Sequence, residues 1–166
     1  MTVAESGVFR RAMLLAAVGP AAALGGCGAS PTRTSLTLTA ATGLNPNQAS
    51  QPSPLVVRVY ELKSVDTFNQ LQFFDLFDQD VAKLGGDLLN RREVEIQPGA
   101  TLEWQREADP GARFVGAIAG YRQLANITWR ASVPLRQESR NAISLRLDEH
   151  SMTVTLVPPS RFLGIF

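Results

Sequence analysis

The chain has 166 residues, with 16 basic and 15 acidic side chains, one histidine and one cysteine. A single cysteine excludes an internal disulfide, and a single histidine excludes a metal site with two histidine ligands. The nearly balanced charge argues against nucleic acid or an anionic bilayer surface as an electrostatic partner.

The first 27 residues have the organisation of an export signal. Two cations, Arg10 and Arg11, precede the apolar run Ala12–Val18, and the small residues Gly25 and Gly26 follow. That order is typical of a secretory signal peptide. The sequence Leu-Gly-Gly-Cys at its end resembles a bacterial lipobox. We therefore predict that residues 1–26 are a lipoprotein signal peptide that is removed.

Cys27 is the predicted lipid-attachment residue, and no other cofactor is expected. Several acyl chains on one cysteine would anchor the protein stably in a membrane. Residues 27–34 are small, polar and interrupted by proline, as in a short tether. Gly28 stands where an Asp would favour inner-membrane retention, so we predict the outer membrane. The mature chain then has 14 basic and 14 acidic residues. General secretion and the twin-arginine route both remain open.

The first two predicted strands flank a long connection. Residues 35–39 alternate apolar and polar side chains, and residues 55–62 are β-branched or aromatic on both faces. These patterns predict a strand with one buried face and a strand buried on both. Between them, residues 42–54 contain Gly43 and three prolines and exceed the usual hairpin length. This loop is either a functional surface or a flexible insertion.

A helical segment is predicted from about Thr67 to Leu84, with Ser64 or Asp66 as its cap and Gly85-Gly86 as its end. Its apolar residues recur at helical spacing, which predicts a buried stripe. Phe73 and Leu76 lie off that stripe, so a second face is expected to be buried too. The stripe comprises Phe74, Phe77, Val81, Leu84 and Leu88.

Six further strands are predicted in the second half. Residues 94–96 are followed by a Pro-Gly turn, from which residues 102–104 are expected to pair back. Residues 114–121 are apolar throughout and predict another strand buried on both faces, whose glycines mark bulges or close packing. Residues 127–133, 143–148 and 152–156 alternate, which predicts one buried face each. Trp129 is expected to lie buried between two sheets.

These elements predict a mainly β fold, a two-layer antiparallel β-sandwich with a small helical insertion between early strands. The sandwich domain is expected to span residues 35–166, with the insertion at about 66–88.

No catalytic constellation is found, and no metal site is predicted. His150 lies in a turn and is expected to be solvated. Asp75, Asp78 and Asp80 do not follow the spacing of a calcium loop, and we interpret them as the exposed face of the helix. The apolar end Phe162–Phe166 either packs on the sandwich or forms a partner surface.

Several blocks match a known family in order and spacing, and they cover most of the mature chain. The blocks are the predicted lipobox, Leu44–Asn47, Pro52–Pro54, Val57–Lys63, Phe73–Phe77, Val115–Arg122 and Trp129-Arg130.

Together these blocks resemble the type VI secretion lipoprotein family TssJ, also called VasD or SciN. The resemblance implies a β-sandwich with added helices on the periplasmic face of the outer membrane. It also implies that the chain holds the periplasmic domain of the inner-membrane protein TssM in the secretion membrane complex, where TssL-type proteins are further members. No enzymatic activity and no small-molecule substrate are expected.

In that family the loop after the first strand contacts TssM, and here it corresponds to residues 42–53. Asn47 and Ser50-Gln51 depart from the Asp and Gly-Arg expected there. A periplasm-facing sandwich lipoprotein that binds a small ligand or glycan is the alternative, and it should show a concave, aromatic-lined pocket. The predicted partner-binding residues are Leu44, Asn45, Pro46, Asn47, Gln48 and Gln51.

Overall fold

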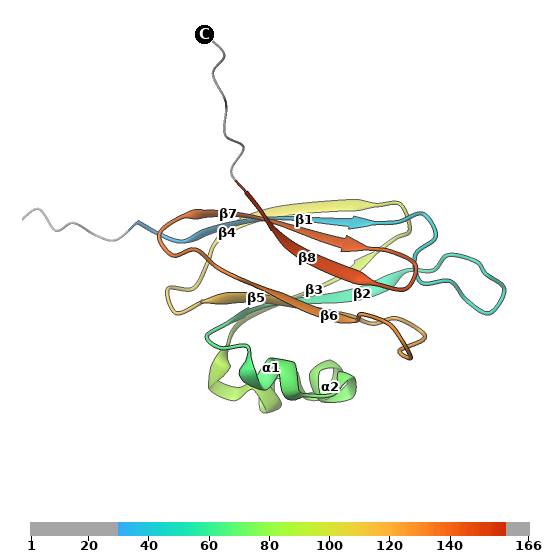
Figure 1. Ribbon diagram of the computed structural model, residues 1–166, viewed down its shortest axis with the longest axis horizontal. Coiled ribbons are helices and arrows are strands. Elements are labelled where there is room, and N and C mark those ends of the chain that lie inside the picture. Colours follow the sequence, from blue (N-terminus) through green and yellow to red (C-terminus); the bar gives the residue numbers. More distant parts are fainter. Residues whose placement is uncertain (1–29, 159–166) are drawn as a thin grey trace, which may run out of the picture.

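The computed structural model describes residues 30–158, which form two packed four-stranded sheets with helices on one outer face (Figure 1). The expected signal peptide, Cys27 and the apolar carboxyl end lie outside the described residues. The strands are β1 (Arg33–Ala40), β2 (Leu55–Leu62), β3 (Leu88–Ile96), β4 (Thr101–Glu107), β5 (Phe114–Ala119), β6 (Arg130–Pro134), β7 (Arg140–Leu147) and β8 (Met152–Val157).

The two-layer sandwich predicted from the sequence is confirmed. Sheet A has the strand order β4-β1-β7-β8 and sheet B the order β3-β2-β5-β6. Neighbouring strands are antiparallel except for β1 and β7, which are parallel. This parallel pair differs from the predicted all-antiparallel arrangement. The parallel pair arises because all of sheet B is inserted between β1 and β7, so both strands enter sheet A from the same end.

The expected pairing of residues 102–104 with residues 94–96 is wrong. The strand β4 pairs with β1 in sheet A, with Leu102 opposite Leu38 and Trp104 opposite Leu36. The turn before it, with Gly99 at φ 76°, carries the chain from one sheet to the other. The Ala40 amide donates to the Ala100 carbonyl at 2.9 Å and fixes this crossing.

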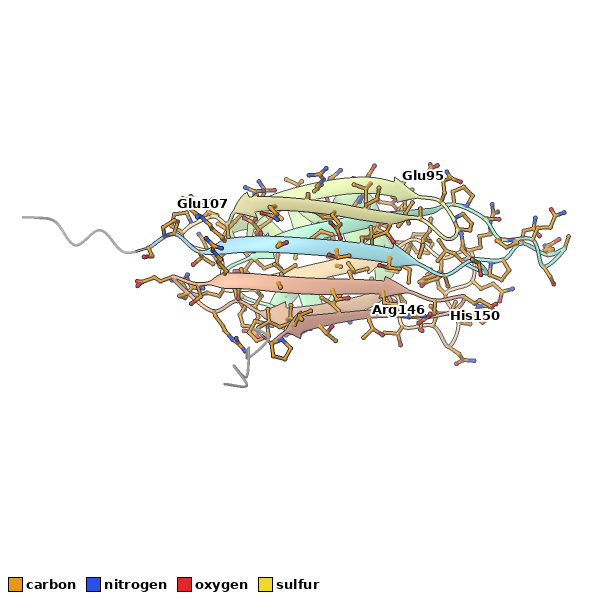
Figure 2. All side chains as sticks on the ribbon, turned by 90° about the horizontal axis from the view of Figure 1, so that it is seen from above. Glu95, Glu107, Arg146 and His150 are labelled. Atoms are coloured by element: carbon orange, nitrogen blue, oxygen red, sulfur yellow. The ribbon has the colours of Figure 1, made fainter. Side chains whose placement is uncertain are left out.

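The main core lies between the sheets and follows the predicted alternation. In β7 the inward residues Ile143, Leu145 and Leu147 are buried, and β8 buries Met152 and Val154. Apart from the exposed Val157, the outward residues of sheet A are polar or small, and no helix within residues 30–158 covers them, as Figure 2 shows from above. The alternation therefore identified the core face of these strands correctly.

A second, smaller core lies on the outer face of sheet B, where the helices pack. The predicted single helical segment is two helices, α1 (Asp66–Gln70) and α2 (Phe73–Leu84), followed by a 3₁₀ turn, η1 (Gly85–Asp87). Gln72 starts α2 with a capping box to Asp75. No helix of the described residues is long and apolar enough to cross a membrane. The buried members of this core are Tyr60, Leu62, Phe68, Leu76, Leu84 and Ile118.

Two glycines of the β5 region allow the helices to approach the sheet. A Cβ on Gly116 would lie 3.0 Å from the Phe68 ring, and one on Gly120 would lie 3.0 Å from the Phe77 ring. The close packing expected at these glycines therefore involves aromatic rings of the helical insertion.

The predicted helical stripe is wrong for two of its members. Phe74 and Val81 are 64% and 62% exposed, whereas Phe73 and Leu76 are buried. The face of α2 that packs on sheet B is thus rotated from the predicted one. The buried residues Phe73, Leu76, Asp80 and Leu84 define this face, and a kink at Gln79, where φ is −135°, interrupts the regular helical spacing that the prediction assumed.

Asp80 also lies on the buried face of α2, so its predicted place on the exposed face is wrong. Its carboxylate accepts from the Tyr60 hydroxyl at 3.0 Å and pairs with Arg91 at 3.0 Å and Arg58 at 3.3 Å. Arg58 also donates to the Phe77 carbonyl of α2. Burial and the adjacent carboxylate raise the pKa of Tyr60, which keeps its hydroxyl a donor. This network attaches α2 to sheet B.

Trp129 is half-buried, and its predicted full burial between the sheets is wrong. It directly precedes the edge strand β6, so its ring reaches around the edge of sheet B and contacts both cores. It meets the Phe73 ring edge to face with centroids 5.2 Å apart, and the Arg130 guanidinium covers it at 4.8 Å.

Replacing Asp80 with Ala should destabilise the protein by about 3–5 kcal/mol, because the arginines on sheet B lose their buried partner. Urea unfolding followed by circular dichroism measures this difference. Asp78→Ala is the matched control in the same helix, and because Asp78 is exposed we expect a change within about 0.5 kcal/mol. Equal effects of the two substitutions would contradict the attachment role of Asp80.

Candidate partner-binding surface

Four connections gather at the end of the sandwich opposite to the start of β1. They are residues 41–54, 97–100, 120–129 and 148–151, which join β1 to β2, β3 to β4, β5 to β6 and β7 to β8. The first is the longest and extends beyond the others at this end in Figure 1. We name this 41–54 segment the tip loop. The chain enters β1 at the other end of the molecule.

The base of the tip loop is part of the core. The Leu44 side chain is fully buried among the residues of the main core. The Ser53 amide donates to the Leu44 carbonyl at 2.9 Å and closes the base of the loop. Gly43 lies directly against the exposed Glu149 side chain, which would have to move to admit a Cβ there. The loop is thereby fixed to the sandwich.

Asn45 joins the tip loop to the β5–β6 connection. Its side-chain amide donates to the Pro54 carbonyl at 2.9 Å, and its side-chain oxygen accepts from the Arg122 amide at 2.9 Å. Its φ of 48° is in the left-handed region, which asparagine tolerates better than most residues. Asn45 and Leu44 were predicted as contact residues, but both are buried within this chain and hold the loop instead.

Asn47 organises the outer part of the loop. Its side-chain oxygen accepts from the amides of Ala49 at 2.9 Å and Gln51 at 3.0 Å, and its backbone amide donates to the Gln51 carbonyl. Ser50, at φ 57°, lets the chain reverse within this turn. Of the predicted contact residues, Gln48 and Gln51 are exposed, and Pro46 and Asn47 are partly exposed.

The neighbouring connections add residues that were not predicted as contact residues. A hollow of about 460 Å³ lies between Pro46–Ala49 and the pair Arg122-Gln123. A second hollow, of about 200 Å³, lies between the tip loop, the β5–β6 connection and the Glu149-His150 turn. Which connections meet could not be predicted from the residues alone, because their proximity depends on strand order.

The tip loop has no charged residue, and His150 is exposed, as expected for a turn residue. Tyr121 supports the surface from below, because its hydroxyl donates to the Ser151 carbonyl at 2.6 Å. Burial raises the pKa of Tyr121, so this hydroxyl stays protonated. The surface is therefore uncharged at its tip and offers amides and apolar atoms for contact.

A hollow that could suit the small-ligand alternative lies at the open edge between β3 and β4. It measures about 270 Å³, and Trp104 lines it. Its charged groups already have partners within the chain: Arg106 pairs with the buried Glu61 at 3.2 Å, and Arg92 stacks on Trp104 at 4.6 Å. Within residues 30–158 no group of three His, Cys, Asp or Glu side chains could hold a metal ion.

Comparison with known families identifies the chain. The family model described as type VI secretion lipoprotein, VasD, EvfM, TssJ, VC_A0113 matches residues 32–150. The chain belongs to this type VI secretion lipoprotein family. The match covers β1 to β7, the helices and the tip loop, and it ends just before β8. The family is one of structural secretion lipoproteins and is not a known enzyme family.

Solved structures agree with this membership. The lipoprotein TssJ1 from Pseudomonas aeruginosa is 33% identical, with a TM-score of 0.75 over 78% of this chain and 98% of that one. Serratia marcescens Lip, a membrane-bound component of the type VI secretion system, is 27% identical, with a TM-score of 0.70 over 75% and 98% of the two chains.

A third match is a chain in a structure described as the TssM C-terminal domain (869–1107) from EAEC. It is 26% identical, with a TM-score of 0.60 over 77% of this lipoprotein and 99% of that chain. A search of curated proteins found no significant match.

Replacing Asn45 with Ala should detach the tip loop from the β5–β6 connection, because both side-chain hydrogen bonds are lost. We expect the Arg122 amide to exchange with solvent at least tenfold faster in hydrogen-exchange measurements. Asn47→Ala is the control, because Asn47 orders the turn without contacting Arg122 in the described contacts. Unchanged protection of Arg122 in the Asn45 variant would contradict this role.

Proposed function

We propose that this lipoprotein is anchored in the outer membrane through lipid on Cys27 and binds the periplasmic domain of a TssM-like inner-membrane protein through its tip loop. It acts as a structural part of the secretion membrane complex, to which TssL-type proteins also belong, and not as an enzyme. The observation that carries the proposal is the position of a fixed, uncharged loop at the end of the sandwich farthest from the chain's entry.

The distance between the two ends supports this arrangement. The strand β1 runs directly from the tethered end to the tip loop and has eight residues. At about 3.3 Å per residue it spans roughly 26 Å. A lipid on Cys27 would hold the start of β1 near the membrane, so the tip loop would point toward the periplasm, where a partner from the inner membrane can reach it.

The internal hydrogen bonds of the tip loop support a binding role. Binding by a flexible loop loses conformational entropy, and a loop already ordered by Asn45 and Asn47 loses less. Because the loop carries no charge, its contacts would depend on shape and on amide hydrogen bonds. Affinity should then respond weakly to salt when this loop dominates the interface.

The likeness to a chain from a structure named for the TssM C-terminal domain supports the choice of partner. The lipid anchor is supported by the family, whose description is that of a lipoprotein, and by the lipobox-like sequence before Cys27. The ligand-binding alternative receives less support, because the charged groups of the hollow at Trp104 are already paired.

Replacing residues 46–51 with a Gly-Ser linker should weaken binding to the periplasmic domain of the TssM-like partner at least tenfold, about 1.4 kcal/mol. The fold should persist, since Leu44 and Asn45 remain. Isothermal titration calorimetry measures the affinity. Glu138→Gly, an exposed change at the opposite end with φ 55°, is the control and should bind normally. Full-strength binding by the folded loop variant would place the interface elsewhere.

Replacing Cys27 with Ser should release a folded protein into the soluble periplasmic fraction and stop secretion, because the acylated thiol is absent. Cell fractionation and a secretion assay measure these effects. The purified variant should still bind the TssM-like domain, which separates loss of the anchor from loss of the interface. Unchanged membrane association of this variant would contradict the lipoprotein assignment.

A further inference from the structure

The chain is rigidly held where it enters the sandwich. Thr32 is buried: its carbonyl accepts from the Ala108 amide at 2.8 Å and its hydroxyl from the Glu138 amide at 2.9 Å. The buried Asn141 donates to the carbonyl of Arg33 at 3.4 Å. The start of β1 is therefore fixed to the sandwich.

The short tether limits how far this end can be from a lipid anchor. Cys27 precedes Thr32 by five residues, and five extended residues span at most about 17 Å. This step depends on the proposed acylation of Cys27. With the anchor in place, side chains around the start of β1 lie within reach of the lipid head groups.

A hollow of about 670 Å³ opens on the outer face of sheet A at this same end. Arg33 of β1 lies in register with Arg140 of β7 on one side and with Glu107 of β4 on the other. Arg106 also lines it and pairs with the buried Glu61. Arg33 and Arg140 are exposed and form no ion pair within residues 30–158. Figure 2 shows Glu107 at this end and Arg146 at the other.

We propose that this hollow binds the phosphate of an anionic phospholipid in the membrane that holds the anchor. Guanidinium groups match phosphate geometry and form paired hydrogen bonds with it. Arg33 and Arg140 supply two guanidinium groups across adjacent strands, and the remaining lining residues are mostly small or polar. Such contacts would fix the tilt of the sandwich on the membrane and direct the tip loop outward.

The attraction is local, because the mature chain has equal numbers of basic and acidic residues. Surface charges act over a Debye length of about 8 Å at physiological salt, so only groups held near the head groups contribute. Glu107 opposes the attraction from within the hollow. Removing an arginine should therefore weaken lipid binding, whereas removing Glu107 should strengthen it.

The test uses the mature chain with Cys27→Ser, so that no covalent lipid contributes. Vesicles of phosphatidylcholine alone and vesicles with added phosphatidylglycerol are sedimented with the protein at low ionic strength. We expect binding to the anionic vesicles only. Arg33→Gln combined with Arg140→Gln should reduce it at least tenfold, and Glu107→Gln should increase it severalfold. High salt should abolish it.

Arg146→Gln is the matched control. Arg146 lies on the same face of the same strand as Arg140, six residues away, and it pairs with Asp148 at 3.1 Å. The Arg146→Gln variant should bind anionic vesicles as strongly as the Cys27→Ser protein that lacks this substitution. The proposal would be overturned if the protein bound both vesicle types equally or bound neither at low salt. It would also be overturned if the Arg146 variant lost as much binding as the Arg33 and Arg140 double variant. Affinity for the TssM-like domain is measured on the same variants and should be unchanged, so failure here is distinct from failure of the tip-loop interface.

Discussion

The pairing of β1 with β4 and β7 is the constraint on which the rest of the structure depends. The strand has a neighbour on each side, antiparallel β4 and parallel β7, and it buries Leu36 and Leu38 in the main core. It also joins the two ends that matter for the proposed function. Its first residues connect to the proposed lipid tether, and its last residues lead into the tip loop. Because the strand is fixed on both sides, the position of the loop relative to the start of β1 is fixed as well.

The tip loop shows how a segment without regular secondary structure can still be rigid. Its carboxamide side chains replace the hydrogen bonds that a sheet would supply: Asn47 closes the outer turn and Asn45 joins the loop to the Arg122 amide. Buried Leu44 adds the hydrophobic contact that holds its base. A surface of this kind combines little conformational freedom with no charge, which suits recognition by shape. The charged residues of the surface belong to the neighbouring connections.

The helical insertion covers sheet B through both apolar and ionic contacts. Aromatic rings from α1 and α2 pack over Gly116 and Gly120, and the buried Asp80 pairs with arginines of β2 and β3. Within residues 30–158 no helix covers sheet A, and its outer face is polar apart from Val157. The two faces of the sandwich are therefore unequal. The uncovered face contains the arginine-lined hollow, while the covered face leaves Phe74 and Val81 as its exposed apolar residues.

The sequence by itself determined the β-sandwich, the core faces of β7 and β8, the doubly buried β2 and β5, and the family. Alternation with period two and apolar runs are local properties, and they survive folding unchanged. Only the tertiary structure decided that β4 joins sheet A, that β1 and β7 are parallel, that Asp80 is buried and that Leu44 and Asn45 support the loop without being exposed. These outcomes depend on which segments meet across the chain. A carboxylate in a helix becomes buried only when arginines from other strands are placed against it, and no local pattern records that meeting.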